Sequence, residues 1–303
     1  MSVTFPRSLG NCGLGLLAGV LACSPSRPQP IEQSRTDAAA PTSSLATPAG
    51  SASAAANHVD AGTTSPPGPM ILIKGGTFRM GSDSIEGPYN SSPAHVVKVP
   101  SFHIDVTEVT VAAYRACVRA GVCTEPLPRS RWLACTWGAP GLDAHPINCV
   151  TWGQADAYCK WAGKELPSEE QWEYAARGTR GRDFPWGMGL AGHAWGLPED
   201  EDAYVQGCDP GPNTTCPVGS APKGDTPEGV HDLAGNVTEW TASTFCAYDQ
   251  PSCGSSKRVV RGAARSDGGR ERHAASRVGI DPVRAEDRFG FRCAQRVDDS
   301  KTP

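Results

Sequence analysis

Hydrophobic spacing along the chain predicts short strands first and helices next. Residues 70–80 read MILIKGGTFRM, an apolar run followed by two glycines and then alternating Phe78 and Met80, which predicts a β-hairpin. A second extended segment is predicted from the apolar residues Val97, Val99, Phe102 and Ile104. The part of the chain after residue 105 changes to helical spacing.

Three segments combine apolar residues at helical spacing with a capping residue before them and a glycine after them. The caps and stops are Thr110 with Gly121, Thr151 with Gly163, and a Ser168–Gln171 capping box with Gly178. The inward faces are expected to be Val111, Tyr114, Cys117 and Val118, then Trp152, Ala155, Tyr158, Cys159 and Ala162, then Trp172, Ala175 and Ala176. After residue 180, loops and short strands dominate, and no repeat is present. The expected class is a loop-rich α+β fold.

The N-terminus has the pattern of a bacterial lipoprotein signal. Arg7 precedes a short apolar stretch that is too short to span a bilayer and that ends in VLAC. We therefore predict a signal peptide over 1–22 and lipidation of Cys23, against the alternative of an ordinary secretory signal in which this cysteine is incidental. Ser24 follows instead of Asp, which favours the outer membrane of the cell envelope.

Residues 23–68 are rich in Ala, Pro, Ser and Thr and nearly free of large apolar residues. Such a segment cannot bury enough surface to offset the entropy of ordering, so we predict a disordered tether. The folded domain is expected over 69–297, with a tail at 298–303.

Cysteine usage favours disulfides. Of 12 cysteines, 12 − 2 = 10 remain once Cys12 and Cys23 are assigned to the signal and the anchor. An even number in an exported chain without a C-x-x-C motif points to bridges and not to zinc. Local pairs are possible for Cys208 with Cys216, Cys246 with Cys253, and Cys117 with Cys123.

Charge excludes some partners. The formal net charge is −4, which gives no general attraction to nucleic acid or to an anionic membrane. The expected partners are the membrane, through the lipid anchor, and a protein or peptide of the envelope.

A series of motifs resembles the sulfatase-modifying-factor family, founded on the formylglycine-generating enzyme. In order they are MILIKGGTFRMGS, HIDVTEVTVAAYRACVRAG, HPINCVTWGQADAYCKWAGKELPSEEQWEYAARG, FPWG, GVHDLAGNVTEWTAS, RVVRG and FGFRCA. The resemblance covers nearly all of 69–297 and implies a variant of the C-type lectin fold, stiffened by calcium and disulfides.

The same resemblance makes a missing pair of cysteines conspicuous. Active members bind Cu(I) through two thiolates and oxidise a sulfatase cysteine to formylglycine, and thiolates are the ligands that Cu(I) prefers. Counting from Arg261–Gly262, the first cysteine would fall near Asp267 and the second in 268–273, close to Arg272, while Ala264 replaces a family serine. No cysteine lies between Cys253 and Cys293. We therefore predict no catalytic residues and no copper site.

Calcium is the cofactor that the resemblance still implies. The motif DLAGNVTEW matches the family's calcium loop, with side-chain oxygens from Asp232 and Glu239 and carbonyl oxygens from Gly235 and Val237. The alternative is a turn in which the two acids merely accept backbone N–H groups. A second family calcium site would fall at 192–196, but GHAWG lacks its side chains and we do not predict it.

Other features carry less weight. A copper site moved to Cys246 and Cys253 is less expected than a local disulfide, and His95, His103 and His145 lack the spacing of an iron site. The eight tryptophans are expected to pack in the core and loops, against the alternative that one or two lie at the mouth of a groove and stack on a ligand. Nine arginines are expected to pair mainly with acids such as Asp281, Glu286 and Asp287, against the alternative of an anion-binding face: Arg258, Arg261, Arg265, Arg270, Arg272, Arg277, Arg284, Arg288 and Arg292.

Two functions remain open from the sequence. The favoured one is a membrane-anchored binding or scaffold module that has lost oxidase chemistry. The other is an enzyme with an altered or relocated site, in which Asp267, Arg265, Arg270 or His273 performs acid, base or anion work.

Overall fold

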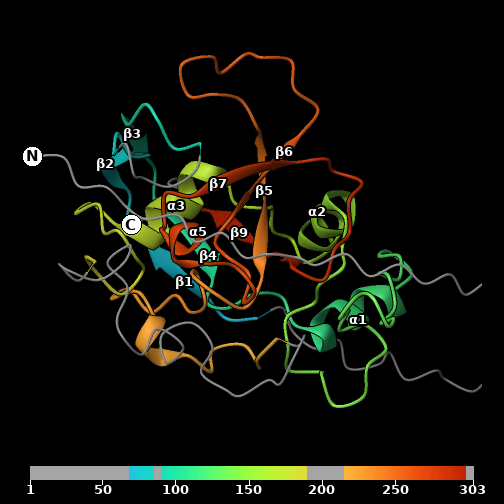
Figure 1. The fold of residues 1–303 in the computed structure, drawn as a ribbon. Helices are drawn as coiled ribbons and strands as arrows, with labels where there is room; N and C mark the ends of the chain where they lie inside the picture. Colours follow the sequence, from blue (N-terminus) through green and yellow to red (C-terminus); the bar gives the residue numbers. More distant parts are fainter. Residues whose placement is uncertain (1–67, 85–89, 190–214, 298–303) are drawn as a thin grey trace, which may run out of the picture. The chain divides into compact units, whose positions relative to one another are not determined.

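The computed structural model describes residues 68–84, 90–189 and 215–297. Its elements are β1 (Met70–Ile73), β2 (Gly76–Met80), β3 (His95–Val99), β4 (Phe102–Asp105), α1 (Val111–Arg119), α2 (Trp152–Trp161), α3 (Glu169–Arg177), the 3₁₀ turn η2 (Pro222–Gly224), β5 (Thr238–Thr244), β6 (Arg258–Arg261), α5 (Gly269–Arg272), β7 (Arg277–Ile280), β8 (Phe289–Gly290) and β9 (Ala294–Arg296). Short elements joined by long connections confirm the loop-rich α+β class (Figure 1). The signal peptide, Cys23 and the tether lie outside the described residues.

The strands form three small sheets. Their orders are β1-β4-β9, β2-β3 and β7-β6-β5-β8. The last is antiparallel except for the parallel pair β5 and β8. The first sheet joins the beginning and the end of the folded part, because β4 lies between β1 and β9.

The predicted hairpin over 70–80 is wrong. β1 pairs with β4, whereas β2 pairs with β3, so the two glycines connect different sheets. A Cβ atom at Gly75 would lie 2.6 Å from the backbone of both Val99 and Ser101, so this close backbone approach requires glycine. The second predicted segment is also divided, because Pro100 separates β3 from β4 and cannot donate to a ladder.

The three predicted helices are confirmed with their caps. The hydroxyls of Thr110, Thr151 and Ser168 each accept a backbone N–H of the first turn. The Ser168–Gln171 capping box is present, and α2 has a second one through Gln154. None of the helices in the described ranges has the length and apolar character needed to cross a membrane.

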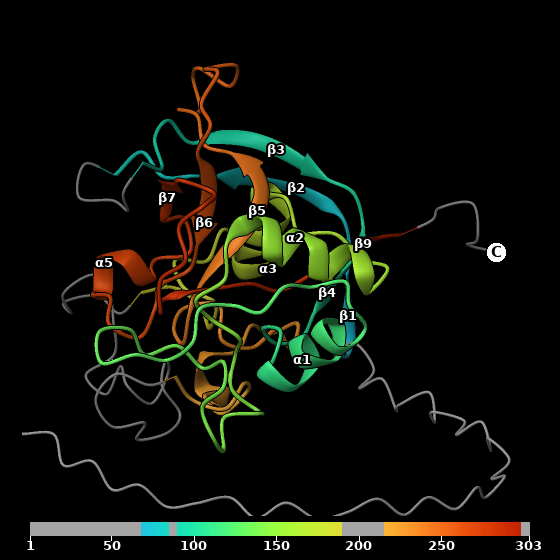
Figure 2. The same cartoon turned by 90° about the vertical axis from the view of Figure 1, so that its right-hand side faces the viewer.

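Two apolar clusters form the core. One surrounds Tyr114, Tyr158 and Trp240, and the other surrounds Phe102, Ile104 and Trp172. Helix α3 contacts β2 and β3 as well as β5 and β6, and thereby connects two of the sheets (Figure 2). Residues of α3 therefore lie beneath the strands that carry the candidate site.

Candidate functional site

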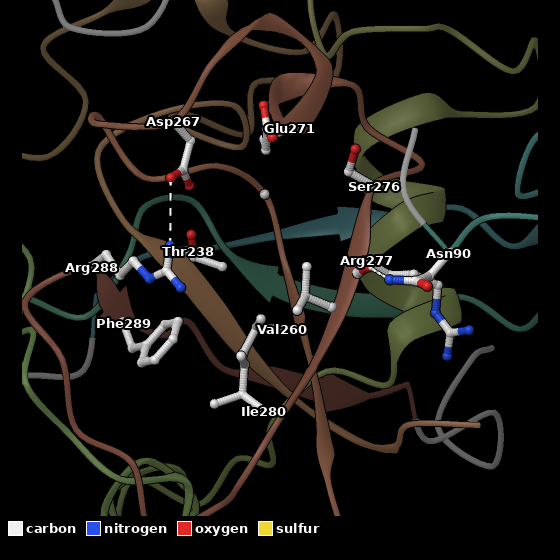
Figure 3. A pocket seen from close by; sticks show the side chains of 12 residues that line it. Asn90, Thr238, Val260, Asp267, Glu271, Ser276, Arg277, Ile280, Arg288 and Phe289 are labelled. Atoms are coloured by element: carbon white, nitrogen blue, oxygen red, sulfur yellow. Dashed lines mark hydrogen bonds and ion pairs between the residues drawn. The ribbon is translucent and has the colours of Figure 1, made fainter. Parts of the chain in front are cut away.

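A cavity of about 370 Å³ lies over one face of the β7-β6-β5-β8 sheet. Its lining comes from the sheet, from the connection between β6 and β7, from the segment before β8 and from one residue between β2 and β3 (Figure 3): Asn90, Thr238, Val260, Gly262, Asp267, Glu271, Ser276, Arg277, Val278, Ile280, Arg288 and Phe289. Gly262 has a φ of +71°, and a Cβ atom there would lie 3.1 Å from Trp172, so the chain leaves β6 through a position suited to glycine.

The three residues predicted near the family's cysteine site all lie in this connection. Asp267 lines the cavity, and its Oδ2 accepts the backbone N–H of Ala264 at 2.8 Å, while its Oδ1 lies 3.7 Å from Arg288 Nη1. Ala264 is buried and lines a smaller neighbouring cavity with Arg265. Arg272 is also buried, and its Nη2 donates to the carbonyl of Arg265. The connection is thus held by a turn and a buried guanidinium.

The donor set of this region does not fit Cu(I). All nine cysteines of the described ranges are disulfide-bonded, so none of them supplies a thiolate. The cavity offers carboxylates, a guanidinium, a hydroxyl and apolar side chains. These groups suit harder cations or organic ligands and not a two-sulfur copper site.

The disulfides agree with the local pairs expected from the sequence and add two others. Cys117–Cys123 and Cys246–Cys253 are confirmed, and Cys135–Cys149 and Cys159–Cys293 are present as well. Cys216 is also disulfide-bonded, whereas its expected partner Cys208 lies outside the described residues. Cys246 and Cys253 therefore form a disulfide within one loop, as expected, and not a relocated copper site.

His273 is poorly suited to act as a general base in this arrangement. Its Nδ1 accepts the backbone N–H of Ala275 at 3.1 Å, and its Nε2 lies 3.4 Å from Asp183 Oδ1. The imidazole lowers the pKa of Asp183 by hydrogen bonding to it. Both ring nitrogens are thus engaged by neighbouring residues, Ala275 and Asp183.

A buried ion-pair network lies on the opposite face of the sheet and was missed by sequence reasoning. Glu169 and Glu173 of α3 meet Arg261 of β6 and Arg277 of β7, with distances of 2.8 Å for Glu173–Arg261 and 2.9 Å for Glu169–Arg277. Burial raises the pKa of Glu169, and the two arginines oppose that shift. The sequence signal was an arginine at each end of an otherwise apolar strand, RVVR. The two positions are three residues apart and so face opposite ways, which places one guanidinium inward.

The arginines do not form an anion-binding face within the described ranges. Arg261, Arg277 and Arg292 are buried in ion pairs with glutamates of α3 and β5. Arg258 stacks over Trp152, and Arg284 and Arg288 contact Glu286. Arg265, Arg270 and Arg272 are also engaged in interactions. Pairing with acids was expected, but the partners of these buried arginines are Glu169, Glu173 and Glu239, none of which was predicted to pair with an arginine.

Two of the histidines make hydrogen-bond contacts with nearby residues, and the tryptophans named here lie either in the core or on the surface. His95 Nδ1 lies 3.1 Å from the carbonyl of Pro93, and His145 Nδ1 lies 3.0 Å from Thr215 Oγ1. Trp172 and Trp240 are fully buried, whereas Trp132 is 77% exposed beneath Arg131. The region 192–196 lies outside the described residues.

The predicted calcium loop contains two non-glycine residues with positive φ, and its two acidic side chains have different hydrogen-bond partners. Asp232 and Asn236 have φ values of +60° and +61°, and Asp232 Oδ2 accepts the N–H of Gly219 at 2.5 Å. Glu239 is fully buried, and both of its oxygens accept from Arg292, at 2.7 and 2.8 Å, with Trp172 Nε1 as a third donor. Glu239 therefore stabilises the loop even without a cation.

Glu108 is the residue near this loop that sequence reasoning missed. It is buried, and within the described ranges neither carboxylate oxygen has a hydrogen-bond partner. Burial raises the pKa of Glu108, the charges of Asp232 and Glu239 raise it further, and Arg292 opposes them. An orphaned carboxylate beside a loop of oxygen donors fits a bound Ca²⁺, since the cation offsets the cost of burying the charge. No three His, Cys, Asp or Glu side chains of the described part cluster as a complete metal-ligand set, so backbone carbonyls would have to complete the site.

The chain is similar in sequence to formylglycine-generating enzymes and in structure to a solved protein. The inactive C-alpha-formylglycine-generating enzyme 2 of Mus musculus is 33% identical over 267 residues, which cover 74% of this chain and 85% of that protein. The formylglycine-generating enzyme of Streptomyces coelicolor is 32% identical over 285 residues, with 76% and 90% covered. The structure of PvdO from Pseudomonas aeruginosa superposes with a TM-score of 0.61 at 27% identity, covering 75% of this chain and 94% of that one.

Residues 55–297 match the sulfatase-modifying factor enzyme 1-like domain. The match spans most of the chain, and the structural similarity confirms the expected variant of the C-type lectin fold. The chain is therefore a member of the sulfatase-modifying factor family.

Proposed function

We propose that this chain is a non-oxidase member of its family and acts as a binding module of the cell envelope. The observation that carries the proposal is the state of the cysteines. Each one in the described ranges is in a disulfide, and the connection from Gly262 to Ser276, where the family resemblance places the copper ligands, contains none. The similarity to the mouse protein named inactive C-alpha-formylglycine-generating enzyme 2 also supports the absence of oxidase activity.

The test is a direct assay for formylglycine. The purified chain is loaded with Cu(I) under reducing conditions and incubated with oxygen and a sulfatase-type peptide that carries the substrate cysteine. We expect no aldehyde, whereas the Streptomyces coelicolor enzyme, as positive control, should form it. Aldehyde formation by this chain would overturn the proposal.

The anchoring part of the proposal rests on Cys23 in the VLAC motif. Lipidation would hold the folded domain off the membrane by a tether of about 35–40 Å, the root-mean-square reach of a coil of its length. Mass spectrometry of the protein from envelope membranes should show a diacylglycerol-modified N-terminal cysteine. The variant Cys23→Ser should move to the soluble exported fraction.

Calcium is proposed as a structural cofactor. The sequence predicted Asp232, Glu239 and the carbonyls of Gly235 and Val237 as its ligands. Because both oxygens of Glu239 accept from Arg292, the proposed set replaces Glu239 with Glu108 and keeps the other three. When bound, the cation would supply charge neutralisation and rigidity.

An enzyme with altered chemistry is the second candidate, and the carboxylates of the cavity favour it. Asp267 and Glu271 face a cavity of ligand size. Mass spectrometry of any captured partner before and after incubation separates the two functions. A changed partner mass would favour the enzyme, and an unchanged one the binding module.

A further inference from the structure

The floor of the cavity is one face of a sheet, and that face is apolar. Val260 and Val278 are paired across β6 and β7, and Ile280 follows on the same face by the period of two. Phe289 is paired with Thr238 at the other side of the floor. The alternate positions point the opposite way, which places Arg261 and Arg277 in the network with α3.

The opposite end of the cavity is acidic. Asp267 and Glu271 lie there, across from the apolar residues (Figure 3). Asp267 is engaged by the N–H of Ala264 and by Arg288. Glu271 makes no hydrogen bond or ion pair with any residue of the described ranges.

Basic groups at the cavity already have partners. Arg288 lies between Asp267 and Glu286, with its Nε 3.3 Å from Glu286 Oε2. The guanidinium of Arg277 is paired with Glu169. Among the residues that the structure describes, the carboxylate of Glu271 is therefore the charged group of the cavity without an ion-pair partner, so charge complementarity favours a positively charged ligand over an anion.

The cavity is open at the edge of its sheet. β7 is an edge strand, and Val278 on it is 40% exposed. An extended polypeptide segment that passes this edge reaches the cavity with one side chain, as in other recognition modes that use strand edges. A volume of about 370 Å³ lies within the range of ligand pockets, about 300–1,000 Å³.

We propose that this cavity binds a lysine side chain of a partner polypeptide, with its ammonium group at Glu271 and its methylene stem over Val260, Ile280 and Phe289. An apolar stem with a charged end matches a pocket that has an apolar floor and a free carboxylate at its rim. The inference rests on the proposed binding function and names the chemistry that its site recognises.

The test is calorimetric titration of the whole purified chain with capped pentapeptides. The probe is acetyl-Ala-Val-Lys-Val-Ala-amide, and its matched comparisons carry norleucine or glutamate in place of lysine. Free n-butylamine distinguishes a peptide from a small amine. The variant Glu271→Gln tests the charge, and Glu125→Gln, at an exposed site away from the cavity, is its control.

The lysine peptide should bind at least about tenfold more tightly than the norleucine and glutamate peptides, because only its ammonium group can form a charged hydrogen bond with the Glu271 carboxylate. Glu271→Gln should remove that preference while its melting temperature stays unchanged, and Glu125→Gln should keep it. Butylamine should bind more weakly than the peptide. Equal binding of the lysine and norleucine peptides, tighter binding of the glutamate peptide, an unchanged preference in Glu271→Gln, or butylamine binding as tight as the peptide would overturn the inference.

The proposed binding function is judged separately, by capture of an envelope protein. If that protein is retained equally by Glu271→Gln, the module binds a partner through another surface, and only the lysine inference fails. If the lysine peptide binds but leaves with a changed mass, the site assignment holds and the non-enzymatic function fails.

Discussion

At the scale of residues, buried charge is the main feature beneath the candidate site. Glu173 is completely buried, and its Oε1 accepts from Gly81 N at 2.7 Å and from Arg177 Nη1 at 2.8 Å, while its Oε2 lies 2.8 Å from Arg261 Nη1. Tyr248 adds a hydroxyl that accepts from Arg261. The charges of such a network depend on each other, because each would be costly to bury alone.

The substitution Glu173→Gln should destabilise the fold by about 3–5 kcal/mol, since it removes the counter-charge of the buried Arg177 and one of the two counter-charges of Arg261. Denaturant unfolding monitored by tryptophan fluorescence measures the loss. The control is Asp156→Asn, which breaks an i,i+4 pair with the exposed Lys160 and should cost about 0.3–0.5 kcal/mol. Similar losses in the two variants would show that the network is not a main source of stability.

His145 should make stability depend on pH. Burial lowers the pKa of His145 below its ordinary value of 6.5, so the unfolded chain takes up a proton more readily than the folded one. The free energy of unfolding is therefore unaffected by this group above pH 6.5, and it decreases as the pH falls from 6.5 toward the lower pKa of the folded state. Melting temperatures measured across this window should fall less for His145→Asn than for the unchanged protein, and parallel curves would contradict this assignment.

At the scale of elements, one disulfide links parts of the chain that are far apart in sequence. Cys159 on α2 is bonded to Cys293, which directly precedes β9, with a sequence separation of 134. The bridge in the loop between β5 and β6, Cys246–Cys253, has a separation of 7. Closing a longer loop restricts the unfolded chain more, so the two bridges should differ in their effect on stability.

The double variant Cys159→Ala/Cys293→Ala should lose about 2–5 kcal/mol of unfolding free energy, the usual effect of removing a structural disulfide. The double variant Cys246→Ala/Cys253→Ala is the control and should lose less, because its loop is short and partly exposed. Chemical denaturation under non-reducing conditions measures both. A larger loss for the local bridge would mean that strain or packing, and not chain entropy, sets the effect.

At the scale of the whole molecule, the proposed calcium site would connect segments from distant parts of the chain. Glu108 precedes α1, Asp232 precedes β5, and Arg292 precedes β9. A cation bound by Glu108 and Asp232 would stabilise the folded state, because a ligand that binds only the folded protein shifts the unfolding equilibrium.

The melting temperature should therefore rise with Ca²⁺ and fall with a chelator. A free concentration of 100 times the Kd corresponds to about 2.7 kcal/mol. Glu108→Gln and Asp232→Asn should each reduce the shift, whereas Glu125→Gln should retain it. An unchanged melting temperature in calcium and chelator would remove the calcium proposal and leave the loop as a turn.

The sequence by itself determined the local structure and the family. Capping hydroxyls act on the next turn of the same helix, so Thr110, Thr151 and Ser168 were recognisable without any tertiary information. The order of the motifs indicated the family, and the absence of cysteine between Cys253 and Cys293 was visible in the same way. The two shortest cysteine spacings within the described ranges also predicted their own bridges, since neighbours in a short loop meet without help from the fold.

The tertiary structure decided what depends on distant partners. Strand pairing follows long-range packing, and for that reason β1 joined β4 and β2 joined β3 instead of forming a hairpin. The glutamate partners of Arg261, Arg277 and Arg292 lie 53 to 108 residues away in the hydrogen bonds that join them. Glu108 is buried, and without a hydrogen-bond partner among the described residues, only because of the fold. The placement of Glu271 and Asp267 in one cavity with an apolar sheet face is likewise a property of three-dimensional arrangement, because hydrophobic and electrostatic free energies depend on which groups meet and how far they are from water.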